Sequence, residues 1–171
     1  MGAKRITLTL TGALLVLGCA AVPPPRPRLA TFEEAGYAPF NQDGTGVIDG
    51  QAFLKTRDGT VMYGADCPVY VDPVTSYSME WWNMTVLQGV PLQPADSRSK
   101  RWEARADADG KFRFDGLPPG EYYVACPITW ECIARDPATD EAAESTEMAG
   151  DFAFALVTVR DGETTSAVLT R

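Results

Sequence analysis

The chemistry open to this chain is limited by a residue type that it lacks, because its 171 residues include no histidine. Without histidine, the chain cannot form a Ser-His-Asp or Cys-His nucleophile pair, an H-E-x-x-H site or a Cys2His2 zinc site. Its 23 Asp and Glu residues leave a hydrolase built on paired carboxylates as a remote alternative. No pair of these residues has a spacing that stands out from acidic residues on a solvated surface. We therefore expect a protein that is not an enzyme and has no cofactor.

Calcium binding is a second candidate chemistry, in the segment NQDGTGVID that begins at Asn41. The segment is similar to the start of an EF-hand loop, because Asn41, Asp43 and Thr45 supply oxygen donors at the first, third and fifth positions. Asp49 stands at the ninth position. The twelfth position, where an EF-hand has a bidentate Glu, is Ala52. We therefore favour a turn that leads into a strand and expect no metal site, with calcium binding as the alternative function.

An aromatic cluster is a third candidate, as a surface for a sugar ring or a protein partner. Tyr77, Trp81 and Trp82 fall within residues 76–87, which contain no Pro or Gly and predict a short amphipathic helix. On a helix, Tyr77 and Trp81 share a face, while Trp82 points about 100° away. Simple packing of these rings against the rest of the fold is the interpretation that we favour, because aromatic residues at helical spacing more often belong to a core. A partner-binding surface is the alternative.

Cys19 is the candidate for covalent modification by lipid. Lys4 and Arg5 precede an apolar run that is too short to span a bilayer and is typical of a secretory signal. The run ends in Val-Leu-Gly directly before Cys19, which resembles the lipobox of bacterial lipoproteins. The resemblance implies cleavage before Cys19 and acylation of that residue, which would bind membrane lipid as a firm anchor. An ordinary signal peptide and an uncleaved anchor are the alternatives.

The lipobox also predicts the organisation of the chain. We expect a signal peptide at 1–18, a lipidated cysteine followed by a Pro-rich extended tether at 19–30, and one domain at 31–171. In the lipoproteins that this sequence resembles, a residue other than Asp after the lipidated cysteine implies the outer membrane. Ala20 holds that position. The expected location is the bacterial outer membrane, facing the periplasm or the cell surface.

The balance of charge excludes one class of partner. The chain has 15 Lys and Arg residues against 23 Asp and Glu residues, a net charge of −8. Nucleic acid binding requires a broad basic surface that neutralises phosphates. We therefore expect no nucleic acid partner.

The pattern from about residue 46 onward predicts an antiparallel all-β domain, because short apolar runs alternate with Gly, Pro, Asn and Asp. A long strand is expected over 121–132, and a final hairpin is expected to pair 152–159 with 164–170. Asp-Ala-Asp-Gly at 107–110 predicts a second hairpin. The acidic segment 136–150 is expected to be a mobile loop.

The central part of this pattern resembles a known family. The segment GKFRFDGLPPGEYYV at 110–124 is similar to the G-x-F-x-F-x-x-[LV]-P-x-G-x-Y-x-[VL] block of carboxypeptidase regulatory-like domains. The resemblance implies a transthyretin-like β-sandwich of about seven strands, here with one inserted helix. It also implies a non-catalytic structural or binding module with a protein or glycan partner. Within the block we expect four residues to be largely buried: Phe112, Phe114, Tyr122 and Val124.

Three cysteines remain after Cys19, so one disulfide and one free thiol are expected in an oxidising compartment. Cys126 and Cys132 are six residues apart on one predicted strand, which separates them by roughly 20 Å and prevents a bond. The start of one antiparallel strand lies near the end of its neighbour, which favours Cys67 with Cys132. We therefore predict a Cys67–Cys132 disulfide and a buried, unreactive Cys126.

Overall fold

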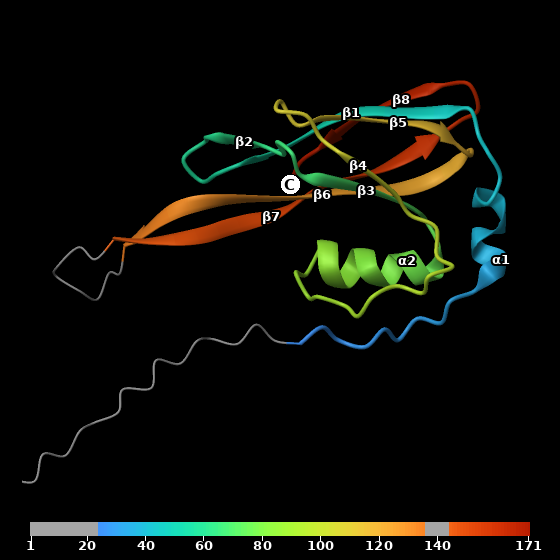
Figure 1. The fold of residues 1–171 in the computed structure, drawn as a ribbon, viewed down its shortest axis with the longest axis horizontal. Helices are drawn as coiled ribbons and strands as arrows, with labels where there is room; N and C mark the ends of the chain where they lie inside the picture. The colour runs from blue at the N-terminus through green and yellow to red at the C-terminus, as the bar shows by residue number, and fades with distance from the viewer. Residues whose placement is uncertain (1–23, 136–143) are drawn as a thin grey trace, which may run out of the picture.

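The computed structural model describes residues 24–135 and 144–171, so Cys19 and the predicted signal peptide lie outside the described residues. Two four-stranded sheets pack face to face as a sandwich (Figure 1). The all-β prediction is confirmed, with eight strands instead of about seven. The elements in chain order are α1 (Glu34–Tyr37), η1 (Ala38–Phe40), β1 (Gly46–Lys55), β2 (Val61–Tyr63), β3 (Pro68–Pro73), α2 (Ser76–Trp81), η2 (Trp82–Val86), β4 (Trp102–Arg105), β5 (Lys111–Leu117), β6 (Gly120–Arg135), β7 (Glu144–Val159) and β8 (Thr164–Leu169).

The pairing of strands differs from the expected hairpins at two turns. The first sheet contains β1, β2, β5 and β8, and the second has the order β4-β3-β6-β7. β8 therefore leaves β7 and joins the other sheet, where it pairs with β1 in parallel. β4 and β5 likewise belong to different sheets, although Gly110 makes the expected turn with a φ of +74°. Both predicted hairpins are wrong, because each turn carries the chain from one sheet to the other.

The core lies between the two sheets and contains the central block of the sequence. Phe112, Phe114, Tyr122 and Val124 are all buried, as predicted. The Tyr122 hydroxyl donates a hydrogen bond to the carbonyl of Pro118 at 2.7 Å, which satisfies its polar atom inside the core. Burial raises the pKa of this phenol.

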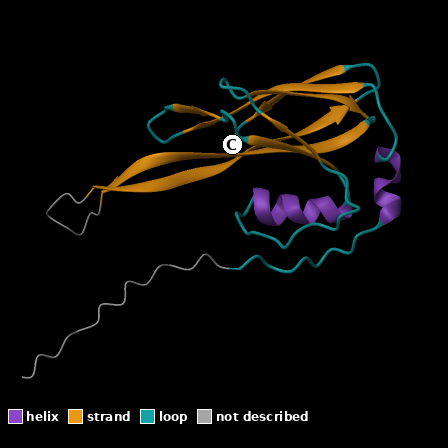
Figure 2. Cartoon of the chain, in the orientation of Figure 1, coloured by secondary structure: helices purple, strands orange, loops and turns teal. Residues whose placement is uncertain are grey.

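A helical segment covers the outer face of the second sheet (Figure 2). It runs from Ser76 to Val86, close to the predicted range, but its second half is a π-helix in which the amide of Leu87 donates to the carbonyl of Trp82 at 3.0 Å. Thr75 and Ser78 form a capping box at its start, because each side-chain oxygen accepts a hydrogen bond from the other residue's amide. The capping box therefore fixes where this helical segment begins.

β6 and β7 extend well beyond the other strands (Figure 1). β3 pairs with β6 only over Tyr122–Ala125, and the remainder of β6 pairs in the described structure with β7. We call the projecting part, residues 126–135 and 144–153, the arm. Residues 144–150 were expected to be a loop but are strand, paired one to one with β6. The outer end of the arm, residues 146–148 included, is exposed and has the polar composition of a loop, which explains the error. Residues 136–143 lie outside the described residues.

Part of the predicted tether is attached to the domain. The amide of Arg26 donates to the carbonyl of Pro91, and the amide of Gln93 donates to the carbonyl of Arg26, both at 2.8 Å. Arg28 adds a side-chain hydrogen bond to the carbonyl of Gln93 at 3.1 Å. Within the described residues, no helix has the length and apolar character needed to span a membrane.

Candidate functional site

The inner face of β6 continues past the end of the facing sheet, and a cleft opens there. Residues on this face up to Ile128 pack in the core, and the next one, Trp130, is only half-buried. The cleft has a volume of about 570 Å³, within the range of roughly 300–1,000 Å³ that is typical of small-ligand sites. We call it the Trp130 cleft. Its lining residues are Leu54, Lys55, Thr56, Arg57, Trp130, Ala149, Gly150, Asp151 and Arg171.

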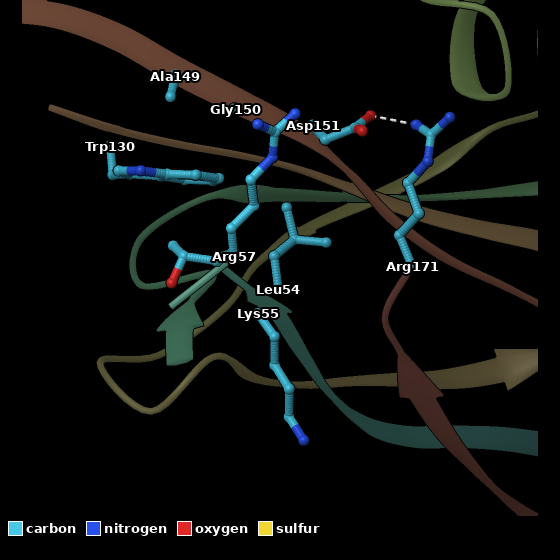
Figure 3. A pocket seen from close by; sticks show the side chains of 9 residues that line it. Leu54, Lys55, Arg57, Trp130, Ala149, Gly150, Asp151 and Arg171 are labelled. Atoms are coloured by element: carbon cyan, nitrogen blue, oxygen red, sulfur yellow. Dashed lines mark hydrogen bonds and ion pairs between the residues drawn. The ribbon is translucent and has the colours of Figure 1, made fainter. Parts of the chain in front are cut away.

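The turn between β1 and β2 places Arg57 at the cleft. Asp58 holds this turn, because its carboxylate accepts hydrogen bonds from the hydroxyls of Thr56 and Thr60. These hydrogen bonds lower the pKa of Asp58. The Arg57 guanidinium extends toward β7 near Gly150, whereas the Lys55 side chain points away (Figure 3). Arg57 has no ion-pair partner among the described residues, so its donors are available to a ligand.

Small residues on β7 lie opposite the part of β6 that carries Trp130. Ala149 is directly opposite Trp130 across the arm, and Gly150 is opposite Thr129. A Cβ atom at Gly150 would lie 2.6 Å from the carbonyl oxygen of Ile128, closer than atoms pack. Glycine is therefore required for the close approach of the two strands at the cleft.

An ion pair closes the other end of the cleft. The Arg171 guanidinium donates to the Asp151 carboxylate and, at 3.0 Å, to the carbonyl of Leu87 (Figure 3). Both side chains of the ion pair remain partly exposed. Arg171 thereby links the C-terminal end of the described chain to β7 and to the end of the helical layer.

This combination of groups suits the binding of a sugar. An indole face packs against the apolar C–H face of a sugar ring. A guanidinium donates hydrogen bonds in a planar fork, and a carboxylate accepts them from hydroxyls. Asp151 is the one carboxylate among the described lining residues, whereas hydrolysis of a glycosidic bond generally uses a pair.

The predicted aromatic surface does not form a platform in the structure. Tyr77 and Trp81 are buried, with 5% and 8% of their surface exposed. Trp82 is half-buried and stacks on Tyr123, with ring centroids 4.4 Å apart, while Phe154 meets its ring edge-on at 5.2 Å. The three rings hold the helical layer on the sheet, which is the interpretation that we favoured from the sequence.

Two of the predicted calcium ligands, Thr45 and Asp49, make contacts with other parts of the domain. The Thr45 hydroxyl donates to Asp161 at 3.3 Å and accepts from the amide of Gly162 at 2.8 Å. Asp49 lies in β1 and forms an ion pair with Arg113 at 3.1 Å. Within residues 24–135 and 144–171 no group of three or more His, Cys, Asp or Glu side chains is placed to hold a metal ion. Asn41 and Asp43 lie in the segment between η1 and β1.

The predicted Cys67–Cys132 disulfide is also absent, because both residues carry free thiols in the structure. The register that places Tyr70 opposite Ala125 puts position 128, not 132, beside Cys67. Cys132 is four residues further along the arm, roughly 13 Å away. The prediction failed because β6 continues past 132, so this residue is not at the end of a strand beside Cys67.

A buried ion pair beneath the helix was not foreseen. Arg101 donates to both carboxylate oxygens of Asp72, at 2.9 and 2.8 Å, and its guanidinium lies 4.3 Å from the ring centroid of Trp81 and 4.9 Å from that of Tyr70. Burial raises the pKa of Asp72, against the hydrogen bonds and charge of Arg101. The adjacent cavity has a volume of about 80 Å³, too small for a sugar ring. We interpret this cluster as structural.

The structure is that of a β-sandwich domain with a surface cleft. The chain is similar in structure to a proposed carbohydrate-binding protein, PA1324, from Pseudomonas aeruginosa, with a TM-score of 0.70 and 29% sequence identity. The likeness covers 84% of this chain and 100% of that one. No protein-family model matches the sequence, and no curated protein matches it either.

Proposed function

We propose that this protein is a membrane-anchored, non-catalytic lipoprotein that binds a glycan in the Trp130 cleft. The observation that carries the proposal is the half-buried indole of Trp130 beside the unpaired guanidinium of Arg57, in a cleft of sugar-binding size. The likeness over most of this chain to a proposed carbohydrate-binding protein supports the same class of ligand. The resemblance to carboxypeptidase regulatory-like domains supports a non-catalytic role.

The cleft offers each part of a sugar a matching group. The indole of Trp130 packs against one face of the ring, and Arg57 donates to hydroxyls or to an acidic substituent at its edge. Asp151 accepts from a hydroxyl on the opposite side, where Arg171 holds its carboxylate in place. The groups come from three separate elements, which a rigid sandwich keeps in position before the ligand arrives.

The first experiment is a binding screen of the whole protein against immobilised oligosaccharides. The panel contains neutral hexose oligomers, amino-sugar oligomers and oligomers with uronic acids. Retention of the wild-type protein by at least one class, with a dissociation constant from calorimetry, supports the proposal. If no class retains the wild-type protein more than a Trp130→Ala variant, the proposal is wrong.

A second prediction concerns Arg57. Arg57→Gln is expected to weaken binding of the best oligosaccharide from the screen by roughly threefold to tenfold, because it removes a charged donor while the turn stays intact. Lys111→Gln is the matched control, since it also removes one positive charge but comes from an exposed residue that does not line the cleft. Calorimetry on both variants compares them with the wild type. Equal losses for the two variants would mean that only net charge matters and that Arg57 does not touch the ligand.

Anchoring is proposed from Cys19 and the signal that precedes it. In a bacterial host, Cys19→Ser is expected to abolish incorporation of labelled fatty acid and to move the protein from the membrane to the soluble fraction. Gel autoradiography and fractionation measure both effects, with Cys132→Ser as a control that keeps the lipid. A wild-type protein without lipid label would contradict the anchor and leave the glycan site unaffected.

A further inference from the structure

Two of the free thiols belong to the same core cluster, Cys126 as a buried member and Cys67 as a partly buried one. Cys67 comes directly before β3, and Cys126 lies on β6, the strand that pairs with β3. The register that sets Tyr70 opposite Ala125 sets position 69 opposite Cys126, so the two cysteines occupy diagonal positions on the same face of the sheet. Cys126 is buried, and Cys67 packs against the same core.

The turn before β3 fixes Cys67 in this place. The amide of Cys67 donates to the carbonyl of Gly64 at 3.1 Å, and its own carbonyl accepts from the amide of Ala106 at 3.0 Å. Gly64 also makes room for the second sulfur, because a Cβ atom there would lie 3.0 Å from the Sγ of Cys126. Gly64 therefore contacts both cysteines, because its carbonyl holds the Cys67 backbone and its missing side chain leaves room for the Cys126 sulfur.

We infer that Cys67 and Cys126 form a disulfide when the folded protein meets a small-molecule or protein disulfide. The Cys67 thiolate attacks a sulfur of that oxidant, forms a mixed disulfide and releases one thiol. The Cys126 sulfur then attacks Cys67 and releases the second thiol. The two thiols of the protein lose two electrons and two protons, and the oxidant's disulfide takes them up to become two thiols.

The order of the two steps follows from exposure. Cys67 is half-buried, so an oxidant reaches it first. Burial raises the pKa of Cys126 to about 12, and the neighbouring Cys67 adds to the shift. The buried Cys126 thiol is thus a poor nucleophile toward an oxidant in solvent, and it serves as the resolving group because it shares the core face of the sheet with Cys67.

The bond would connect β6 to the start of β3 at the place where the arm begins. Beyond this point, β6 pairs only with β7 in the described structure. A bridge here joins residues far apart in the sequence and limits the freedom of the unfolded chain. It would stabilise the root of the strand that carries Trp130 without closing the cleft. This inference is independent of the proposed function.

The test is peptide mapping of the whole folded protein after oxidation with glutathione disulfide. Free thiols are alkylated, and cleavage after Glu121 and Glu131 separates Cys126 from Cys132. We expect a cross-linked pair of peptides that contain Cys67 and Cys126, with Cys132 alkylated. The melting temperature of the oxidised protein should exceed that of the reduced protein by roughly 5–10 °C.

Two variants complete the test. Cys132→Ser is expected to keep the cross-link and the rise in melting temperature, whereas Cys67→Ser is expected to lose both. Alkylation of both Cys67 and Cys126 in the oxidised wild type would overturn the inference, as would a cross-link from Cys67 to Cys132. Since the wild type alone gives a decisive peptide map, the inference does not depend on the folding of a variant.

Discussion

Replacing Trp130 by alanine is expected to lower the affinity for the oligosaccharide at least about tenfold, or about 1.4 kcal/mol of binding free energy. The indole is the largest apolar surface offered by the Trp130 cleft, and alanine leaves nothing for a sugar ring to pack against. Calorimetry with the best oligosaccharide from the screen measures the loss. Circular dichroism of the same sample checks that the sandwich is retained.

The control for this variant comes from the opposite face of the arm. Ile133 is 67% exposed and three residues further along β6, so its side chain points away from the cleft. Ile133→Ala removes exposed apolar surface from the arm and should leave affinity unchanged, while Trp130→Phe should retain part of it. An equal loss in Ile133→Ala, or an unchanged affinity in Trp130→Ala, would place the binding surface elsewhere.

Arg101→Met is expected to lower the free energy of unfolding by about 3–5 kcal/mol, the cost of leaving a buried carboxylate without its ion-pair partner. Asp72 is only 6% exposed, and Arg101 is its ion-pair partner. Without the guanidinium, the carboxylate is buried without a compensating charge, and Trp81 and Tyr70 lose the cation that lies over their rings. Urea unfolding, followed by tryptophan fluorescence, measures the change.

Two further variants separate this effect from the loss of any arginine. Arg113→Met breaks an exposed ion pair with Asp49 and should cost about 0–1 kcal/mol. The double variant Arg101→Met/Asp72→Asn removes the buried charge and should be more stable than Arg101→Met alone. If Arg101→Met and Arg113→Met lower the free energy of unfolding equally, the Asp72–Arg101 pair contributes no more to stability than an exposed ion pair does.

Local patterns predicted much of the secondary structure. Alternation along residues 121–132 indicated the long strand, and the absence of Pro and Gly over residues 76–87 indicated the helix. The burial of Phe112 and Phe114 followed from the alternation around them. In each case the signal is contained in a few neighbouring residues, because a strand or a helix repeats its environment every two to four positions.

The strand partners did not follow from the same patterns. The turns at Gly110 and Gly162 have the positive φ angles that a hairpin turn uses. In this fold, the chain crosses to the facing sheet at each of these turns. As a result, β5 and β8 both pair with β1. The partner of a strand depends on which apolar sheet faces pack against each other in the core. Residues far apart in the sequence decide this, so a short sequence window does not contain the signal.

The candidate site was missed for a related reason. Trp130 is in phase with Ile128 and the core residues before it, so alternation alone assigns it to the core. It lines a cleft only because the facing sheet ends near Leu54, far away in the sequence. Arg57 lies in a turn and Arg171 at the last position, with no motif to connect them. The length of the strand was the one available signal, since 121–132 exceeds every other predicted strand.

The most direct test of the central claim is a titration of the ¹⁵N-labelled protein with the best oligosaccharide, followed by NMR. The four tryptophans provide four indole N–H signals, and only Trp130 lines the cleft. We predict that the Trp130 indole and the Gly150 amide shift with saturation, while the indoles of Trp81, Trp82 and Trp102 stay in place. Saturable shifts of Trp81 or Trp82 with Trp130 unmoved would contradict the account and return the binding site to the helical layer.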